Sequence, residues 1–382
     1  MGVSCSISAG DGEKMIAHLK KEKVMSIAFL LALISALFVH PDKEYLEYVD
    51  VRVLALLFGL MLLVKGFQEL GLFDLLIRRI FGKVTNSRLL CQLLVMLCFF
   101  SSMLITNDVA LITFVPFAIL ALRMCHQEKR MITVVVLQTM AANLGSMFTP
   151  IGNPQNLYLF SVSGMTLEAF FGTMIFPTLL SFVLLLAVTF LIPRDEICLK
   201  VDGTGKKMNA KELVLYTILF LANLFVVFRV LHYIPALLLT ILGVLLLGNR
   251  KLFARVDYAL LMTFIGFFIF VGNLGRIPTI RHFVEQLLTG RELVVAAIFS
   301  QFLSNVPAAL MLSGFTTQYT KLLIGVNVGG LGTLIASMAS LISYKVYAGQ
   351  EDADIGKYML QFTIYNVVGL IILLAASVCM MQ

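Results

Sequence analysis

The sequence predicts an all-α integral membrane protein, on the strength of its composition, its long uncharged runs and an internal repeat. Of the 382 residues, 59% are hydrophobic and only 13% are charged, and the mean hydropathy is +0.95. A soluble domain carries roughly 25% charged residues. Many windows therefore reach the length of about 20 apolar residues that one membrane-spanning helix needs.

Basic residues at the ends of the apolar runs orient the chain, because cytoplasmic loops carry an excess of Lys and Arg. Segment 1–23 is polar and ends in a cluster of lysines. We expect this segment in the cytoplasm, followed by a retained first helix rather than a cleaved signal. A second helix over 51–71 returns to a basic patch inside. The net charge of +7 lies in such clusters, so nucleic acid is not an expected partner.

Residues 89–122 form a run of 34 residues in which Asp108 is the only charged one. One span needs about 20 residues and two spans with a turn need more than about 40, so the run fits neither. Both of its flanks are basic. The run therefore predicts a re-entrant helical hairpin that enters from the cytoplasm and turns at mid-depth near Thr106–Asp108. Irregular backbone is tolerated there only beside protein or a water-filled cavity.

The next crossing, residues 131–161, is interrupted by the glycines, prolines and asparagines of "ANLGSMFTPIGNPQN". Such residues do not continue a regular helix, so we expect a broken transmembrane helix. A helix over 166–193 then completes a first transmembrane half, residues 24–193. The polar segment 194–211 is the expected cytoplasmic linker to the second half.

The second half, residues 212–382, repeats this order of elements. Its predicted elements are helices over 212–231, 234–248 and 257–275, a second hairpin over 293–320, a second broken helix over 322–347 and a last helix over 358–381. The second hairpin has "SNVP" near its centre and would enter from the opposite face. The N-terminus is then cytoplasmic and the C-terminus outside.

The two halves share an internal repeat. "NLGSMFTPIGNPQN" (143–156) and "NVGGLGTLIASMAS" (327–340) have four identities in fourteen positions, against roughly one expected by chance. The hairpin tips "SSMLITND" and "SQFLSNVP" also correspond, and in each a hydroxyl pair at i, i+4 lies on one helix face. Because the halves start in opposite directions, the repeat is inverted. Inverted repeats with discontinuous helices are typical of secondary transporters.

"TNDVAL", "TPIGNPQNLYL" and "NVGGLGTLIAS" resemble the citrate-transporter-like and arsenite-permease branch of the ion transporter superfamily. The resemblance covers about residues 50–382, and this superfamily also contains the divalent-anion/sodium symporters. It implies two sodium sites, the first at Ser102, Thr106, Asn107 and the loop near Gly152, and the second at Ser300, Ser304, Asn305 and the loop near Ala336. It also implies that the substrate lies between Asn107, Asn305, Asn153 and Ser337, beside the tip hydroxyls of Thr106 and Ser304.

The third tip position departs from the symporter pattern, which has Thr there. This sequence has Asp108 in the first half and Val306 in the second. An ionisable group at mid-membrane indicates a functional site, so we expect Asp108 to bind the coupling ion. The alternative is that the polar tip residues only cap the second half-helices. Lys65 and Glu69, spaced i, i+4, are expected to form a structural pair.

These features predict a multi-pass secondary active transporter of the plasma (inner) membrane. It would move a small anion, citrate or another carboxylate, coupled to a proton or sodium gradient. Arsenite efflux, sodium/proton antiport and, from another class, an ion channel are the alternatives. An enzyme is not expected, since neither a His-Glu-x-x-His motif nor a nucleophile with a nearby base is visible. Besides the coupling ions we expect no cofactor, and the expected partners are the anionic substrate, membrane lipid and a second copy in a homodimer.

Overall fold

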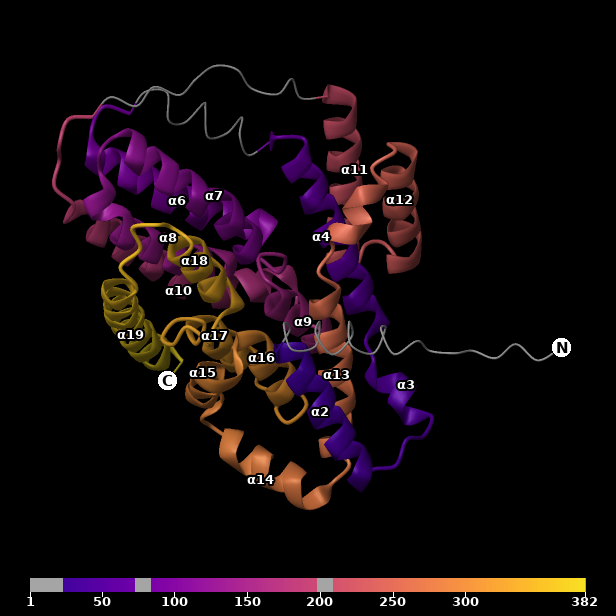
Figure 1. Ribbon diagram of the computed structural model, residues 1–382. Coiled ribbons are helices and arrows are strands. Elements are labelled where there is room, and N and C mark those ends of the chain that lie inside the picture. Colours follow the sequence, from indigo (N-terminus) through magenta and orange to yellow (C-terminus); the bar gives the residue numbers. More distant parts are fainter. Residues whose placement is uncertain (1–22, 73–83, 198–208, 382) are drawn as a thin grey trace, which may run out of the picture.

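The computed structural model describes residues 23–72, 84–197 and 209–381, which form helices and no strand (Figure 1). Seven of these helices are long and apolar enough to cross a membrane: α4 (Val51–Glu69), α6 (Ser87–Ile105), α7 (Asn107–Met124), α10 (Leu167–Phe190), α11 (Ala210–Val227), α13 (Tyr258–Gly275) and α19 (Ile355–Met380). The predicted all-α integral membrane fold is confirmed. All but the last residue of the predicted segment 1–23 and most of the linker 194–211 lie outside the described residues.

The shorter helices complete the chain. They are α2 (Lys23–Phe38), α3 (Glu44–Tyr48), α8 (Met131–Ser146), α9 (Pro154–Ser163), α12 (Tyr233–Leu246), α14 (Pro278–Leu288), α15 (Glu292–Leu303), α16 (Asn305–Ser313), α17 (Tyr319–Val328) and α18 (Met338–Ala348), with 3-10 turns η1 (Glu128–Arg130) and η2 (Arg250–Arg255). Single residues, Thr106 and Ser304, separate α6 from α7 and α15 from α16. Longer loops separate α8 from α9 and α17 from α18.

The end of the second hairpin and the presence of helix α14 differ from the sequence prediction. The second hairpin was expected to reach residue 320, but α16 ends at Ser313 and α17 already begins at Tyr319. The turn between them is uncharged, so composition did not mark it. Helix α14 was not predicted, because its apolar residues alternate with charged ones and no long apolar run forms. Its apolar and polar residues lie on opposite faces, as in a helix at a membrane surface.

The helices pack in two groups (Figure 1). We call α2, α3, α4, α11, α12 and α13 the peripheral bundle, because α2 packs on α13 while α11 and α12 pack on α4. We call α6 to α10 and α15 to α19 the hairpin core, in which the helices on either side of Thr106 and Ser304 pack against the broken helices. The groups meet where α4 contacts α9 and where α13 contacts α16.

Within the hairpin core, the two halves make matching contacts. Helix α6 packs on α8 of its own half, and α15 packs on α17 of its own half. The second arms cross over, so that α7 packs on α18 and α16 packs on α9. Helices α7 and α16 also pack on α8 and α17 of their own halves, so each broken helix contacts both arms of its own hairpin and the second arm of the other.

Glycines allow these helices to approach closely. A Cβ atom at Gly145 of α8 would lie 2.0 Å from the carbonyl oxygen of Phe99 in α6. In the second half, a Cβ at Gly329 would lie 2.7 Å from the Cα of Ala297 in α15. Small residues at helix crossings are how membrane helices gain close packing without a hydrophobic driving force.

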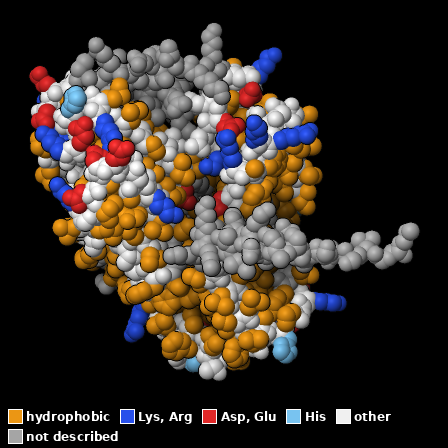
Figure 2. All heavy atoms as spheres, viewed as in Figure 1, with side chains coloured by type: hydrophobic (Ala, Val, Ile, Leu, Met, Phe, Trp, Pro, Cys, Tyr) orange, Lys and Arg blue, Asp and Glu red, His pale blue; other side chains and the backbone are white. Residues whose placement is uncertain are grey.

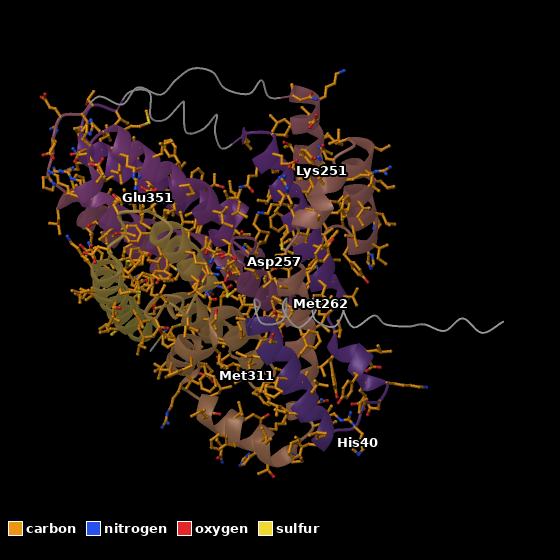
Figure 3. The ribbon with its side chains drawn as sticks, viewed as in Figure 1. His40, Lys251, Asp257, Met262, Met311 and Glu351 are labelled. Carbon is orange, nitrogen blue, oxygen red and sulfur yellow. The ribbon has the colours of Figure 1, made fainter. Side chains whose placement is uncertain are left out.

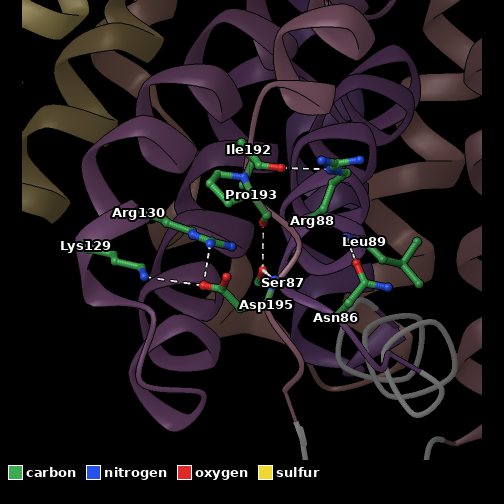
Figure 4. A network of polar contacts seen from close by, with 9 residues as sticks. All are labelled: Asn86, Ser87, Arg88, Leu89, Lys129, Arg130, Ile192, Pro193 and Asp195. Atoms are coloured by element: carbon green, nitrogen blue, oxygen red, sulfur yellow. Dashed lines mark hydrogen bonds and ion pairs between the residues drawn. The ribbon is translucent and has the colours of Figure 1, made fainter.

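Polar contacts join the two ends of the first hairpin (Figure 4). The Oγ of Ser87, at the start of α6, accepts a hydrogen bond of 2.9 Å from the backbone N–H of Asp195. The Asp195 carboxylate forms ion pairs with Arg130 at 2.6 Å and Lys129 at 3.3 Å, just after α7 ends. The outer ends of both arms thus lie on the same side, as in a hairpin.

The described surface is dominated by apolar side chains, as Figure 2 shows over much of one face. Exposed leucine, isoleucine, valine and phenylalanine side chains occur on most of the long helices. Charged side chains gather mainly toward the upper end of that view. An apolar exterior of this kind suits contact with lipid rather than water.

Candidate functional site

The two hairpin tips have the same backbone conformation. Thr106 has φ 71° and ψ 152°, and Ser304 has φ 77° and ψ 153°. This region is occupied almost only by glycine, and a residue with a side chain costs about 1–3 kcal/mol there. Such strain persists where surrounding structure imposes it, and it is common at functional sites.

Each tip contacts the loop of the broken helix in its own half. The backbone N–H of Asn107 donates to the Gly152 carbonyl at 3.2 Å, and that of Asn305 donates to the Ala336 carbonyl at 2.9 Å. The side-chain oxygen of each asparagine also accepts from the next backbone N–H, at 3.0 Å from Asp108 and 2.9 Å from Val306. The tips and loops are therefore joined by matching bonds in the two halves.

The capping alternative applies to the two tip asparagines, but the contacts do not extend it to the tip hydroxyls or to Asp108. Neither Thr106 nor Ser304, which precede α7 and α16, makes a side-chain capping bond. The first-turn N–H groups are satisfied by the asparagines instead. Asp108 therefore does not serve as the N-cap of α7.

A network of buried asparagines joins the halves. Asn143 Oδ1 accepts from Asn107 Nδ2 at 3.1 Å and from Ser337 Oγ at 2.9 Å. Asn327 Oδ1 accepts from Asn153 Nδ2 at 3.0 Å. Asn143 and Asn327 are the first residues of the two repeat segments. Each accepts a hydrogen bond from a residue of the opposite half that directly precedes a helix, Ser337 before α18 or Asn153 before α9.

Sequence reasoning missed the roles of Asn143 and Asn327. Their identity in the two repeat segments was a signal for them, but it was used only to establish the repeat. Their partner side chains come from the opposite half. Aligning the two repeat segments shows which residues correspond, but it does not show which residues of one half contact the other half.

Of the hydroxyl residues predicted to bind cations, three are buried in the protein and one lines a cavity. Ser102 and Ser300 are fully buried and donate to backbone carbonyls one turn back, at 2.9 Å to Phe99 and 2.8 Å to Ala296. Ser304 is buried beside Asn305 Oδ1 at 3.4 Å. Thr106, in contrast, is half-buried and lines a cavity.

Two adjoining cavities lie where the hairpin core meets the peripheral bundle. One, of about 130 Å³, is lined by Thr106, Asp108 and Asn153 from the hairpin core and by Lys65 of α4. The other, of about 50 Å³, is lined by Asn107, Asn305 and Ser337, together with Asp108. Five of the six residues predicted to hold the substrate thus lie in the walls of these two cavities, whereas the buried Ser304 lines neither.

Acidic side chains mark the junction between the cavities. Asp108 and Asp257 line both of them. Figure 3 places Asp257 near the centre of the molecule, and Figure 2 shows a hollow at this level with acidic atoms inside. Asp257 precedes α13 and its carboxylate accepts from the Leu260 N–H at 2.9 Å. Sequence reasoning missed Asp257, since it lies at the end of an apolar run and looks like an ordinary loop acid.

The expected pair between Lys65 and Glu69 is not formed. Glu69 makes an ion pair with Arg255 of η2, while the Lys65 ammonium donates to Gln68 Oε1 at 3.5 Å. Helical spacing brings Lys65 and Glu69 to one face, but Arg255 from another element lies closer to Glu69. Lys65 is left facing the cavity that contains Asp108.

The arrangement suits ions of both signs. The N-terminal ends of α7, α9, α16 and α18 all begin at residues that line the cavities, and helix N-termini carry a partial positive charge. Asp108 and the carbonyl ends of the preceding half-helices attract cations. Within the three described stretches of chain, no group of three or more His, Cys, Asp or Glu side chains is placed to hold a metal ion.

Comparison with known proteins agrees with this architecture. A family model described as citrate transporter matches residues 15–320. An uncharacterized transporter of Methanocaldococcus jannaschii is 32% identical over 354 residues, which are 92% of this chain and 95% of that protein. Inner membrane protein YbiR of Escherichia coli is 30% identical over 312 residues, which are 80% of this chain and 82% of that protein.

A weaker similarity extends to animal proteins. The P protein of Homo sapiens is 28% identical over 166 residues, which are 42% of this chain and 19% of that protein. The family match covers most of the chain, and the apolar helices agree with it. The chain is therefore a multi-pass membrane transporter and belongs to the citrate transporter family.

Proposed function

We propose that the chain is a secondary active transporter that moves a small anion, citrate or a related carboxylate, coupled to a proton or sodium gradient. The observation that supports this most strongly is the meeting of four half-helix N-termini at two cavities that share Asp108. One site then offers both anion-attracting helix ends and a cation-attracting carboxylate.

The anion would lie between Asn107, Asn305, Asn153 and Ser337. The asparagine amides and the Ser337 hydroxyl now donate within the asparagine network. To bind a substrate they would exchange these hydrogen bonds for bonds to the anion, so the network would open when a substrate enters. Thr106 would contribute its hydroxyl from the cavity wall, and Ser304 from beside Asn305. The tips carry no basic side chain, so the partial positive charge that attracts the anion would come from the helix N-termini.

The cation would bind at the tips. A first sodium site would take oxygens from Ser102, Thr106, Asn107 and Gly152, and a second from Ser300, Ser304, Asn305 and Ala336. Asp108 adds a full negative charge only to the first. A proton or a sodium ion on Asp108 would remove its repulsion of an incoming carboxylate, so cation and anion would bind together.

The protein would work in the plasma (inner) membrane, surrounded by lipid, with a cytoplasmic N-terminus and an external C-terminus. The two halves would be inverted relative to each other and would expose the site to each side in turn. We propose transport without catalytic chemistry, without a cofactor other than the coupling ions, without a nucleic-acid partner, and by a homodimer.

Flux measurements test this proposal. The purified chain in proteoliposomes is given labelled citrate, other labelled carboxylates, arsenite or sodium, under an imposed proton or sodium gradient. We expect saturable, gradient-driven carboxylate uptake. Gradient-driven movement of arsenite alone, or sodium/proton exchange without an anion, would assign the protein to those activities instead. Flux that never saturates and needs no gradient would indicate a channel.

A further inference from the structure

Lys65 is the basic side chain in the wall of the larger cavity. It lies on α4 of the peripheral bundle, half-buried, and it lines the cavity together with Asp108 of the hairpin core. Within the described chain, neither residue takes part in an ion pair. The two charges therefore face each other across the cavity without direct contact.

The charged groups around this cavity come from three elements of the peripheral bundle and one of the hairpin core. Asp108 interacts electrostatically with Lys65 and with Asp257, and Lys65 interacts also with Asp257 and Arg255. Arg255 is itself paired with Glu69. Lys65, Asp108 and Asp257 leave one negative charge in excess, which a single monovalent cation would neutralise.

Both Lys65 and Asp108 are absent from the matching positions of the second half. Helices α4 and α13 each precede a hairpin and begin after an aspartate cap, Asp50 or Asp257, whose carboxylate accepts from the N–H three residues later. Counted from these caps, Lys65 corresponds to Gly272. Asp108 corresponds to Val306 at the tips.

The matching positions of the second half, Gly272 and Val306, carry no charge. Gly272 packs against the Tyr48 ring, since a Cβ there would lie 2.4 Å from it, so no long side chain fits. A lysine inside a membrane is costly unless it has a partner or a function. Opposite charges added in the same half, to one cavity and from separate groups of helices, act on each other.

We propose that Lys65 is a tethered counter-charge that competes with the coupling cation for Asp108. When the site is empty, the ammonium neutralises Asp108 and allows the unloaded protein to change its conformation. When a cation takes its place on Asp108, Lys65 is released and its positive charge attracts the anionic substrate. This inference rests on the proposed function, and it explains how an anion is held although neither tip carries an arginine.

Transport assays separate the two halves of this cycle. The full-length protein in proteoliposomes is assayed with labelled citrate for exchange, with citrate on both sides, and for net uptake, with citrate outside only. With citrate at saturating concentration, we expect exchange in Lys65→Met within about twofold of wild type and net uptake reduced about tenfold or more, because without the ammonium nothing neutralises Asp108 while the site is empty. The KM for citrate should rise several-fold in both assays, since the charge that attracts the anion is lost. Lys65→Arg, which keeps the charge, retains the ratio of net uptake to exchange.

A double variant distinguishes charge compensation from a structural role. Lys65→Met combined with Asp108→Asn removes both charges, so we expect downhill net uptake to recover several-fold over Lys65→Met although it no longer responds to an ion gradient. The exposed lysine variant Lys251→Met serves as the control and behaves as wild type. Equal losses of exchange and net uptake in Lys65→Met, or no loss in either, would overturn the inference.

Cation binding gives a second readout that needs no substrate. Thermal stability of the detergent-solubilised protein is measured against sodium concentration, with choline replacing sodium. We expect half-saturation in Lys65→Met at about tenfold lower sodium than in wild type, since a competing positive charge has been removed. If sodium stabilises wild type and the half-saturating sodium concentration is the same in Lys65→Met, the role proposed for Lys65 is contradicted. Wild type that transports none of the labelled carboxylates under either a proton or a sodium gradient contradicts the proposed function itself.

Discussion

The two hairpins of this transporter share a frame but differ in what they carry. Thr106 and Ser304 have the same unusual backbone conformation, and each tip bonds to the broken-helix loop of its own half. The first hairpin has arms of 19 and 18 residues and a charged tip, whereas the second has arms of 12 and 9 residues and an uncharged tip. The common part is the backbone geometry of the tips and their bonds to the loops, and the difference places the charge in one half.

The broken-helix loops show how the same need is met by different residues. In the first half, Asn156 Nδ2 donates to the carbonyls of Ser146, Met147 and Thr149. In the second half, Gln301 of α15 donates to the carbonyls of Gly329 and Leu331. A helix that breaks inside a membrane exposes carbonyls which must be satisfied by protein. Geometry is thus repeated even where the residues that stabilise it are not.

The largest expected effect comes from making the first tip neutral like the second. Asp108→Asn should reduce gradient-driven uptake by about a hundredfold or more, because the cation loses its full negative partner in a site of low dielectric. Uptake is measured in proteoliposomes, and folding is checked by size-exclusion chromatography. The matched variant at the other tip, Val306→Asn, should retain gradient dependence. Unchanged gradient dependence in Asp108→Asn would exclude Asp108 as the coupling residue.

The helix crossings should come next in size. Gly145→Ala forces a Cβ against the Phe99 carbonyl and should cost about 1–3 kcal/mol, seen as a lower thermal unfolding midpoint and lower yield. Gly329→Ala, with a wider approach to Ala297, should cost less. Gly172→Ala on α10, where nothing lies within 4 Å, is the control and should not destabilise. Equal midpoints for all three variants would show that the crossings tolerate a methyl group.

Removing the side chains that hold the broken-helix loops should cost a similar or smaller free energy of unfolding. The two losses show which of the two loops depends more on its side-chain contacts. Asn156→Leu leaves three carbonyls without their amide donor, and Gln301→Leu leaves two between α17 and α18 without theirs. An unsatisfied buried polar group costs about 1–3 kcal/mol, so both variants should have lower unfolding midpoints. Each side-chain oxygen also accepts one bond, from Asn327 Nδ2 at Asn156 and from the Thr333 N–H at Gln301. Asn156→Leu should be the worse, because it leaves three carbonyls without a donor rather than two. A lower unfolding midpoint for Gln301→Leu than for Asn156→Leu would show that the second loop depends more on its side-chain hydrogen bonds.

The smallest effect is expected at an exposed ion pair of the peripheral bundle. Arg276, after α13, contacts the Asp42 carboxylate at 2.7 Å and holds the pKa of that carboxyl below its ordinary value of 3.8. A lowered folded-state pKa stabilises the protein above the ordinary pKa, and this contribution is lost as pH falls through the folded value. Arg276→Gln should therefore lower the unfolding midpoint slightly at pH 7. The difference from wild type should shrink below about pH 4, and a difference that grows there would contradict this assignment.

Much of the fold could be predicted because the deciding signals are local. The glycines, prolines and asparagines of 142–156 cannot continue a helix, and the lone charge at Asp108 marks a turn in an apolar run. Helix α14 escaped prediction, since charges interrupt its apolar residues and a search for long apolar runs passes over it.

The site was harder to predict because its contacts cross between elements. The spacing of Lys65 and Glu69 describes one helix only, whereas the partner of Glu69 is Arg255 and Lys65 faces Asp108. The asparagine network likewise joins opposite halves. Local sequence gives the residues of such a site, but their partners follow from how the helices pack.

The contact at the base of the first hairpin has a consequence for how the chain is made. Asp195 joins Ser87 and Arg130, although it follows Ser87 by 108 positions in the chain. During synthesis, α6 to α9 are produced before the residue that fastens them. Until α10 has been made, Arg130 lacks the carboxylate that it contacts in the folded protein, so we expect the first hairpin to reach its final packing only when its whole half has been inserted.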